Sequence, residues 1–121
     1  MKKKDRDFIM FLEDILDSAN LIEKYVKGKT KKIFAVDGQT KDAVIRRFEI
    51  IGEATKHVPN SLKKNHKEIE WNRIADMRNV LIHEYFGVNV DKVWVAIKED
   101  VPNLKEKISK ILEDLKVDKL I

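Results

Sequence analysis

Three side chains that suit chemistry on a phosphate group lie close together between residues 78 and 85. Arg78 can clamp phosphate oxygens through two hydrogen bonds, and His83 can exchange protons near neutral pH. Tyr85 carries a hydroxyl that can donate or accept a hydrogen bond. Asn79, directly after the arginine, can orient the phosphate or the imidazole. The sequence therefore predicts Arg78 and His83 as catalytic residues, Asn79 as a supporting residue, and no metal or other cofactor.

The spacing of these residues constrains the geometry of such a site. At about 100° per residue, Arg78 falls inside the apolar stripe of Ile74, Met77 and Leu81. A buried, unpaired guanidinium is very costly, so Arg78 must face an anion, a wet cleft or a subunit interface. His83 lies roughly 140° round an ideal helix from Arg78. Either this helix is distorted at its end, or the site is completed by a second helix or a second subunit.

Each motif residue also has a purely structural interpretation. Arg78 can be ion-paired to a neighbouring helix. His83 can be a hydrogen-bonded histidine near a helix end, where the helix dipole favours its charged form. Tyr85 can pack in a core or an interface with its hydroxyl solvated. Their combination in one short stretch favours a functional site.

Arg-x4-His-x-Tyr, with a polar residue after the arginine, resembles the signature of the HepT-like toxin family of HEPN-domain ribonucleases. The sequence around the motif agrees with this resemblance at residues 42–54, 71–77, 85–88 and 93–94. The resemblance runs from about residue 5 to residue 115, nearly the whole chain.

The resemblance implies a metal-independent endoribonuclease toxin of a type VII HEPN/MNT toxin–antitoxin pair, with RNA as its substrate. It also implies a cognate MNT-type nucleotidyltransferase antitoxin that modifies Tyr85 to O-AMP-tyrosine and so silences the toxin. His83 would then be the general acid or base, and Arg78 would stabilise the transition state. A homodimer with both motifs facing one groove would complete the site.

Two other functions remain open from the sequence. The first is a non-catalytic helical subunit that binds a nucleotide through Arg78, or docks a small nucleotidyltransferase, in a two-protein nucleotidyltransferase. The second is a purely structural helical dimer. Cleavage of RNA by the purified protein without added metal separates the ribonuclease from both.

The elements that must position the motif are all predicted to be helices. Apolar residues recur at three- and four-residue steps over residues 8–26, 44–58 and 104–115. Gly28 should stop the first helix, Asp37 and Gly38 should form a turn before the second, and Pro59 should end it. Residues 60–67 allow one short helical turn. The third helix opens at Trp71 and carries the motif, a short fourth spans residues 90–97, and Pro102 fits the first turn of the last. The expected fold is all-α, an up-and-down bundle of four to five helices.

The composition is that of one cytoplasmic domain over residues 1–121. The chain has no cysteine, and no apolar run approaches the length of a membrane span. The net charge of +4 modestly favours polyanions. Lysine clusters at residues 2–4, 27–32 and 63–67 could steer RNA, although such runs usually serve solubility.

A few residues outside the motif have simpler expected roles. Arg47 fits a salt bridge to another helix better than a second phosphate contact, and Arg46 and Glu53 point to the opposite side, where they can form ion pairs. His57 and His66 have no partners at metal-site spacing and are expected at the surface. The two tryptophans, Trp71 and Trp94, are expected as core or interface anchors.

Overall fold

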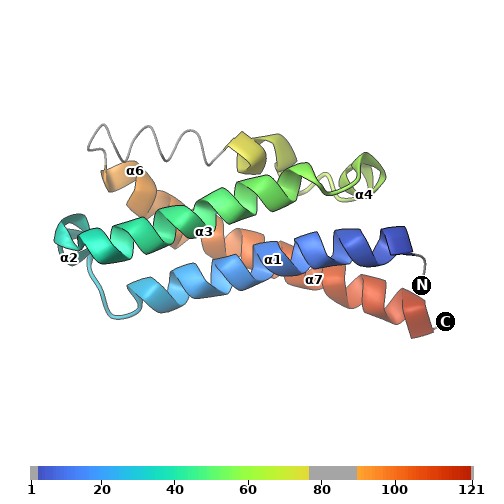
Figure 1. The fold of residues 1–121 in the computed structure, drawn as a ribbon, viewed down its shortest axis with the longest axis horizontal. Coiled ribbons are helices and arrows are strands. Elements are labelled where there is room, and N and C mark those ends of the chain that lie inside the picture. The colour runs from blue at the N-terminus through green and yellow to red at the C-terminus, as the bar shows by residue number, and fades with distance from the viewer. Residues whose placement is uncertain (1–2, 77–89, 121) are drawn as a thin grey trace.

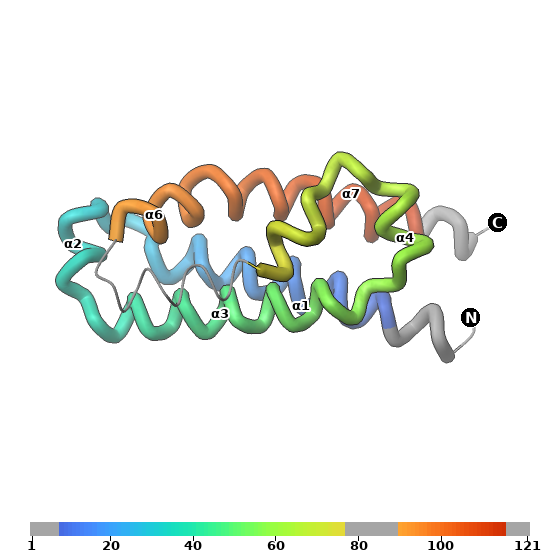
Figure 2. Tube along the Cα trace, turned by 90° about the horizontal axis from the view of Figure 1, so that it is seen from above, coloured from blue at the N-terminus to red at the C-terminus, as the bar shows by residue number. Residues whose placement is uncertain are grey.

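Three long helices lie side by side and form the body of the molecule (Figure 1). The computed structural model describes residues 3–76 and 90–120, and the side chains within residues 8–76 and 90–115. The long helices are α1 (Lys3–Val26), α3 (Gly38–Lys56) and α7 (Val101–Leu120). α1 runs antiparallel to both α3 and α7 and packs against each of them (Figure 2). All regular elements within the described ranges are helical, which confirms the predicted all-α fold.

The apolar stripes predicted from the sequence form the core. α1 buries Leu12, Ile15 and Ile22 completely, α3 buries Val44 and Ile51 completely, and α7 buries Ile108 completely. These residues recur at three- and four-residue steps, so each helix presents one continuous apolar face to the others. None of the helices in the described part of the chain is long and apolar enough to cross a membrane.

A short helix that the sequence analysis did not predict, α2 (Lys31–Val36), lies between α1 and α3. Gly28 ends the preceding helix region with a φ of 77°, a left-handed conformation that glycine adopts without steric cost. Thr30 then caps α2, accepting a hydrogen bond from the amide of Ile33. With six residues, α2 is too short to show a helical period in the sequence. Its buried Phe34 packs against Trp94, with the ring centroids 5.3 Å apart.

Asp37 and Gly38 mark the start of α3, as predicted. The Asp37 carboxylate accepts hydrogen bonds from the amide of Thr40 (3.1 Å), from the Thr40 hydroxyl (2.7 Å) and from Lys29 Nζ (3.1 Å). These hydrogen bonds hold the pKa of Asp37 down at about 2, with those from Thr40 contributing most. Asp37 therefore fixes the direction in which α3 leaves the α2 connection.

The predicted short helical turn after Pro59 is α4 (Asn60–Asn65), which lies at the opposite end of the bundle from α2 (Figure 1). Its Leu62 is buried and joins α4 to the core. Residues 71–76 are helical, which confirms that Trp71 opens the third predicted helix. The indole N–H of Trp71 donates to the backbone carbonyl of His66 (3.0 Å) and ties this helix to the turn after α4.

The fourth and last helices are not separated as the sequence suggested. α6 (Val90–Val95) continues through a π-helical turn, η1 (Ala96–Asp100), directly into α7. In an unbroken α-helix, residue 102 would donate to the Lys98 carbonyl, but Pro102 has no N–H and its ring would crowd that carbonyl. The wider turn accommodates the proline, and the amide of Val101 donates to the carbonyl of Ala96, five residues back.

Candidate functional site

The predicted motif residues Arg78, Asn79, His83 and Tyr85 lie outside the described residues. Their roles therefore remain predictions from the sequence. The described chain stops after residue 76, above the middle of α3, and resumes at α6, which lies beside α2 (Figures 1 and 2). The structure thus shows how the chain is held on either side of the motif.

The first turn of the motif-bearing helix is anchored by apolar burial. Ile69, Trp71 and Ile74 are 3%, 7% and 8% exposed, respectively. Ile69 and Ile74 also line a cavity of about 210 Å³, together with Phe48 of α3 and Leu104 of α7. The motif-bearing helix therefore begins beside two of the long helices, α3 and α7. This confirms Trp71 as a core anchor.

Arg73 ties the same turn to the π-helical turn. Its Nη1 lies 3.1 Å from Glu70 Oε2, and its Nη2 lies 3.5 Å from Asp100 Oδ2. The hydrogen bond that Arg73 donates to Glu70 and the charges of both carboxylates raise the pKa of Arg73. Because the side chain is 64% exposed, these pairs contribute little to the free energy of unfolding. This contact could not be predicted from the sequence, since no local pattern connects Arg73 with Asp100.

The charged residues of α3 form local contacts. Arg46 pairs with Glu49 (3.3 Å), as expected on this side, and Glu53 Oε1 lies 3.7 Å from His57 Nε2. Arg47 is half-buried, and no ion pair joins it to another described residue, so its predicted salt bridge is not seen.

The two described histidines are near the surface, as predicted. His57 stacks on Phe11 with ring centroids 4.8 Å apart, and the Nδ1 atom of His66 lies 3.3 Å from Glu68 Oε1. Over residues 8–76 and 90–115, no group of three or more histidine and carboxylate side chains is arranged to hold a metal ion.

Comparisons with known proteins identify relatives over nearly the whole chain. A family model described as "Ribonuclease HepT-like" matches residues 15–111, a range that includes the motif. "Probable ribonuclease HepT" of Thermococcus cleftensis is 46% identical over 111 residues, which cover 92% of this chain and 98% of the relative. A "putative RNase" of Caldanaerobacter subterraneus subsp. tengcongensis is 39% identical over 103 residues, covering 85% of this chain and 92% of the relative.

A longer relative also matches. "Gamma-glutamylcyclotransferase and putative RNase" of Methanocaldococcus jannaschii is 45% identical over 114 residues, which cover 94% of this chain. The chain spans about half the length of that relative, 51%, and nearly all of the Thermococcus relative. No solved structure matches the chain.

Proposed function

We propose, since the chain belongs to the HepT-like ribonuclease family, that it is an endoribonuclease that cleaves RNA without a metal ion. The observation that carries the proposal is the Arg-x4-His-x-Tyr spacing at residues 78–85, which falls inside the range matched by the family model. Arginine and histidine at this spacing supply charge stabilisation and proton transfer, which are the two needs of phosphodiester cleavage.

In the proposed reaction, the neutral His83 imidazole takes the proton of an RNA 2′-hydroxyl. The 2′-oxygen attacks phosphorus, and the bond from phosphorus to the 5′-oxygen breaks. The products are a 2′,3′-cyclic phosphate and a 5′-hydroxyl, whose proton comes from an imidazolium or from water. Arg78 stabilises the extra negative charge on the phosphorane-like transition state, and Asn79 orients the phosphate or the imidazole.

The proposed active unit is a homodimer. Arg78 and His83 diverge by roughly 140° on an ideal helix, so one copy presents them poorly to the same phosphate. A two-fold axis beside the motif would bring Arg78 of one protomer near His83 of its partner. It would also cover the guanidinium, which otherwise lies on an apolar stripe.

We further propose that the chain is a cytoplasmic toxin controlled by a cognate MNT-type nucleotidyltransferase. The Tyr85 hydroxyl oxygen attacks the α-phosphorus of ATP, pyrophosphate leaves, the phenolic proton passes to a base, and O-AMP-tyrosine is formed. On a continuing helix, Tyr85 lies within about 20° of Arg78. The added phosphate would therefore pair with the guanidinium and occupy the position of the RNA phosphate.

Expression of this chain alone, without the partner, tests the toxin proposal. The wild type should arrest growth and His83→Ala should relieve the arrest. The matched control is His57→Ala, which removes an exposed histidine outside the motif and should still arrest growth. Equal arrest by the wild type and His83→Ala would contradict a toxic activity that depends on His83.

A further inference from the structure

A basic groove runs between α4 and the first turn of the motif-bearing helix. Its volume is about 550 Å³, which is large enough for part of a polymer strand. Four cationic side chains line it, Lys63, Lys64, Lys67 and Arg73, against a single carboxylate, that of Glu70. We refer to it as the α4 groove.

The α4 groove is much more positively charged than the chain as a whole. The full sequence holds 25 lysines and arginines against 21 aspartates and glutamates, which is nearly balanced. In the groove, the one carboxylate is already engaged, because Glu70 lies 3.1 Å from Arg73. The three lysines therefore face the groove with no lining carboxylate left to neutralise them.

In the lysine cluster at residues 27–32, two of the four lysines have carboxylate partners. Lys29 pairs with Asp37 at 3.1 Å, and Lys31 pairs with Asp91 at 3.0 Å. By contrast, Lys63, Lys64 and Lys67 form no ion pair with any described residue. Burial without a compensating anion lowers the pKa of Lys63. A bound anion would offset that burial, whereas Lys29 and Lys31 already have carboxylate partners.

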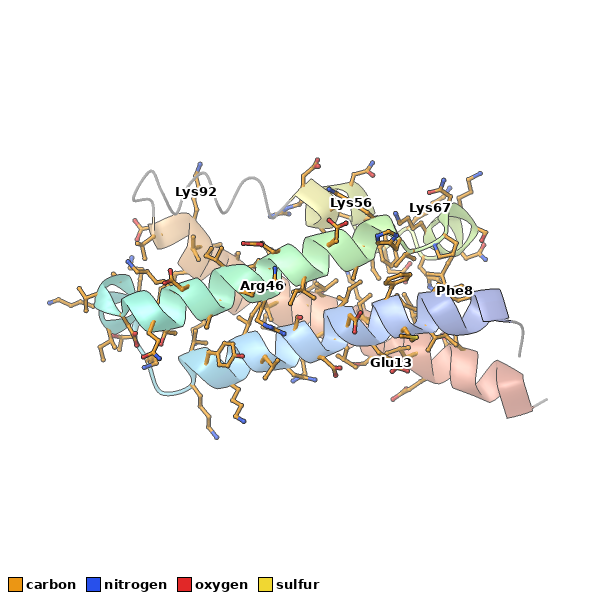
Figure 3. All side chains as sticks on the ribbon, in the orientation of Figure 1. Phe8, Glu13, Arg46, Lys56, Lys67 and Lys92 are labelled. Carbon is orange, nitrogen blue, oxygen red and sulfur yellow. The ribbon has the colours of Figure 1, made fainter. Side chains whose placement is uncertain are left out.

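The backbone under the three lysines is held in place. Buried Leu62 attaches α4 to the core, and the amide of Lys63 donates to the carbonyl of Pro59 (3.1 Å). After α4, the carbonyl of His66 accepts from both the Trp71 indole (3.0 Å) and the Ile69 amide (3.2 Å). Lys67 lies inside this hydrogen-bonded turn, at the α4 end of the molecule (Figure 3). The fold thus fixes the backbone positions of the three lysines.

The α4 groove carries charged and amide side chains, and the two large apolar side chains that line it are largely buried. Its large apolar side chains, Ile69 and Trp71, are only 3% and 7% exposed. The large hydrophobic residues that are exposed in the described part of the chain lie elsewhere, at Met10, Ile33, Val36 and Val95. A protein partner would need apolar anchors at the centre of its interface, whereas a nucleic-acid backbone is held mainly by cations.

We propose that the α4 groove binds the sugar-phosphate backbone of single-stranded RNA, with Lys63, Lys64 and Lys67 each contacting a phosphate. The amides of Asn60 and Asn72, which also line the groove, are available to sugar hydroxyls or base edges. The inference rests on the proposed function for the identity of the ligand. It adds a binding site outside the cleavage motif, on the part of the chain that precedes it.

Binding of a non-cleavable RNA tests this inference independently of catalysis. The probe is a fluorescein-labelled single strand with 2′-O-methyl groups throughout, which cannot undergo attack by a 2′-hydroxyl. Fluorescence anisotropy over 50–200 mM salt gives the affinity and its salt dependence for the full chain. The test variant is Lys63→Gln/Lys64→Gln/Lys67→Gln, in which glutamine keeps a polar side chain and a similar helix propensity while removing the charge.

The matched control removes the same charge from the opposite end of the bundle, by Lys24→Gln/Lys27→Gln/Lys32→Gln at three exposed lysines. Each lost contact to a single strand lowers the slope of log affinity against log salt by about 0.7, so the groove variant should lose about 2 from the slope. Its affinity at 100 mM salt should fall at least tenfold, whereas the control should change by less than about threefold. Circular dichroism should show equal helicity in all three proteins.

The outcomes separate the groove from the proposed enzyme. Equal weakening of RNA binding in the groove and control variants would overturn the inference, because it would mean that only net charge matters.

Poly-L-glutamate at the same charge concentration should compete poorly with the RNA for binding to the protein. If it competes as well as RNA, the groove is a general acidic-polymer surface and the inference fails. Loss of RNA binding in the groove variant supports the groove even if the wild type cleaves nothing. If the wild type cleaves RNA but the groove variant binds RNA as tightly as the wild type, the inference about the α4 groove fails while the proposed ribonuclease activity stands.

Discussion

Replacing Trp71 with phenylalanine should destabilise the protein by about 2 kcal/mol. The change removes the hydrogen bond from the indole to the carbonyl of His66. That carbonyl keeps the amide of Ile69 as a donor (3.2 Å), so the lost hydrogen bond costs only about 1 kcal/mol. The smaller ring leaves buried volume unfilled at a position that is 7% exposed, which costs roughly another 1 kcal/mol. For a chain of this size, the midpoint of thermal unfolding should fall by about 8 °C.

The matched control is Trp94→Phe, the same substitution at the other tryptophan. Trp94 is half-buried, packs on Phe34 and lies under Lys98, whose Nζ is 4.9 Å from the ring centroid. Phenylalanine keeps part of both contacts, so this loss should stay below about 1 kcal/mol. Urea and thermal unfolding followed by circular dichroism measure both variants. Equal destabilisation, or a loss below about 0.5 kcal/mol for Trp71→Phe, would refute the idea that Trp71 fastens the motif-bearing helix to the turn after α4.

Three further predictions concern modification, pH and assembly. Incubation with ATP and the cognate nucleotidyltransferase should add AMP at Tyr85, as seen by intact mass and peptide mapping; addition elsewhere, or silencing of a Tyr85→Phe variant, would contradict this mechanism. Because the pKa of Asp37 is lowered from 3.8 to about 2, its ionised form stabilises the fold above about pH 4, and this contribution is lost as the pH falls towards 2. The melting temperature of the wild type should therefore fall more steeply from pH 4 to 2 than that of Asp37→Asn, and parallel curves would contradict this role. Sedimentation should show a homodimer at micromolar concentration, and a monomer there would count against a composite site.

The long helices could be predicted from the sequence because their burial repeats regularly. Ile15 and Ile22 in α1, like Ile108 and Ile111 in α7, are spaced so that one face of each helix is apolar, and all four are buried. Gly28 likewise marked a helix end through a property of its own backbone, the freedom to adopt a positive φ.

Features that depend on distant partners could not be predicted in the same way. α2 is too short for a period, and its Phe34 is stabilised by Trp94, which is remote in the sequence. Pro102 was recognised as a residue of a first helical turn, but the π-helical turn that joins α6 to α7 depends on how the backbone adapts before it. That Lys29 and Lys31 have carboxylate partners could be seen only from the positions of Asp37 and Asp91 in the fold.

Cleavage of a single-stranded RNA by the purified protein in EDTA tests the central claim most directly. The wild type should cut the RNA and leave 2′,3′-cyclic phosphate ends. Arg78→Ala and His83→Ala should each lose about 10²-fold or more in rate while keeping their helicity, because each removes a charge-stabilising or proton-transferring group. Arg78→Lys should recover little, since an ammonium cannot reproduce the planar fork of a guanidinium. Wild-type activity that disappears in EDTA, or folded Arg78→Ala and His83→Ala variants that cleave as fast as the wild type, would contradict the proposed ribonuclease site.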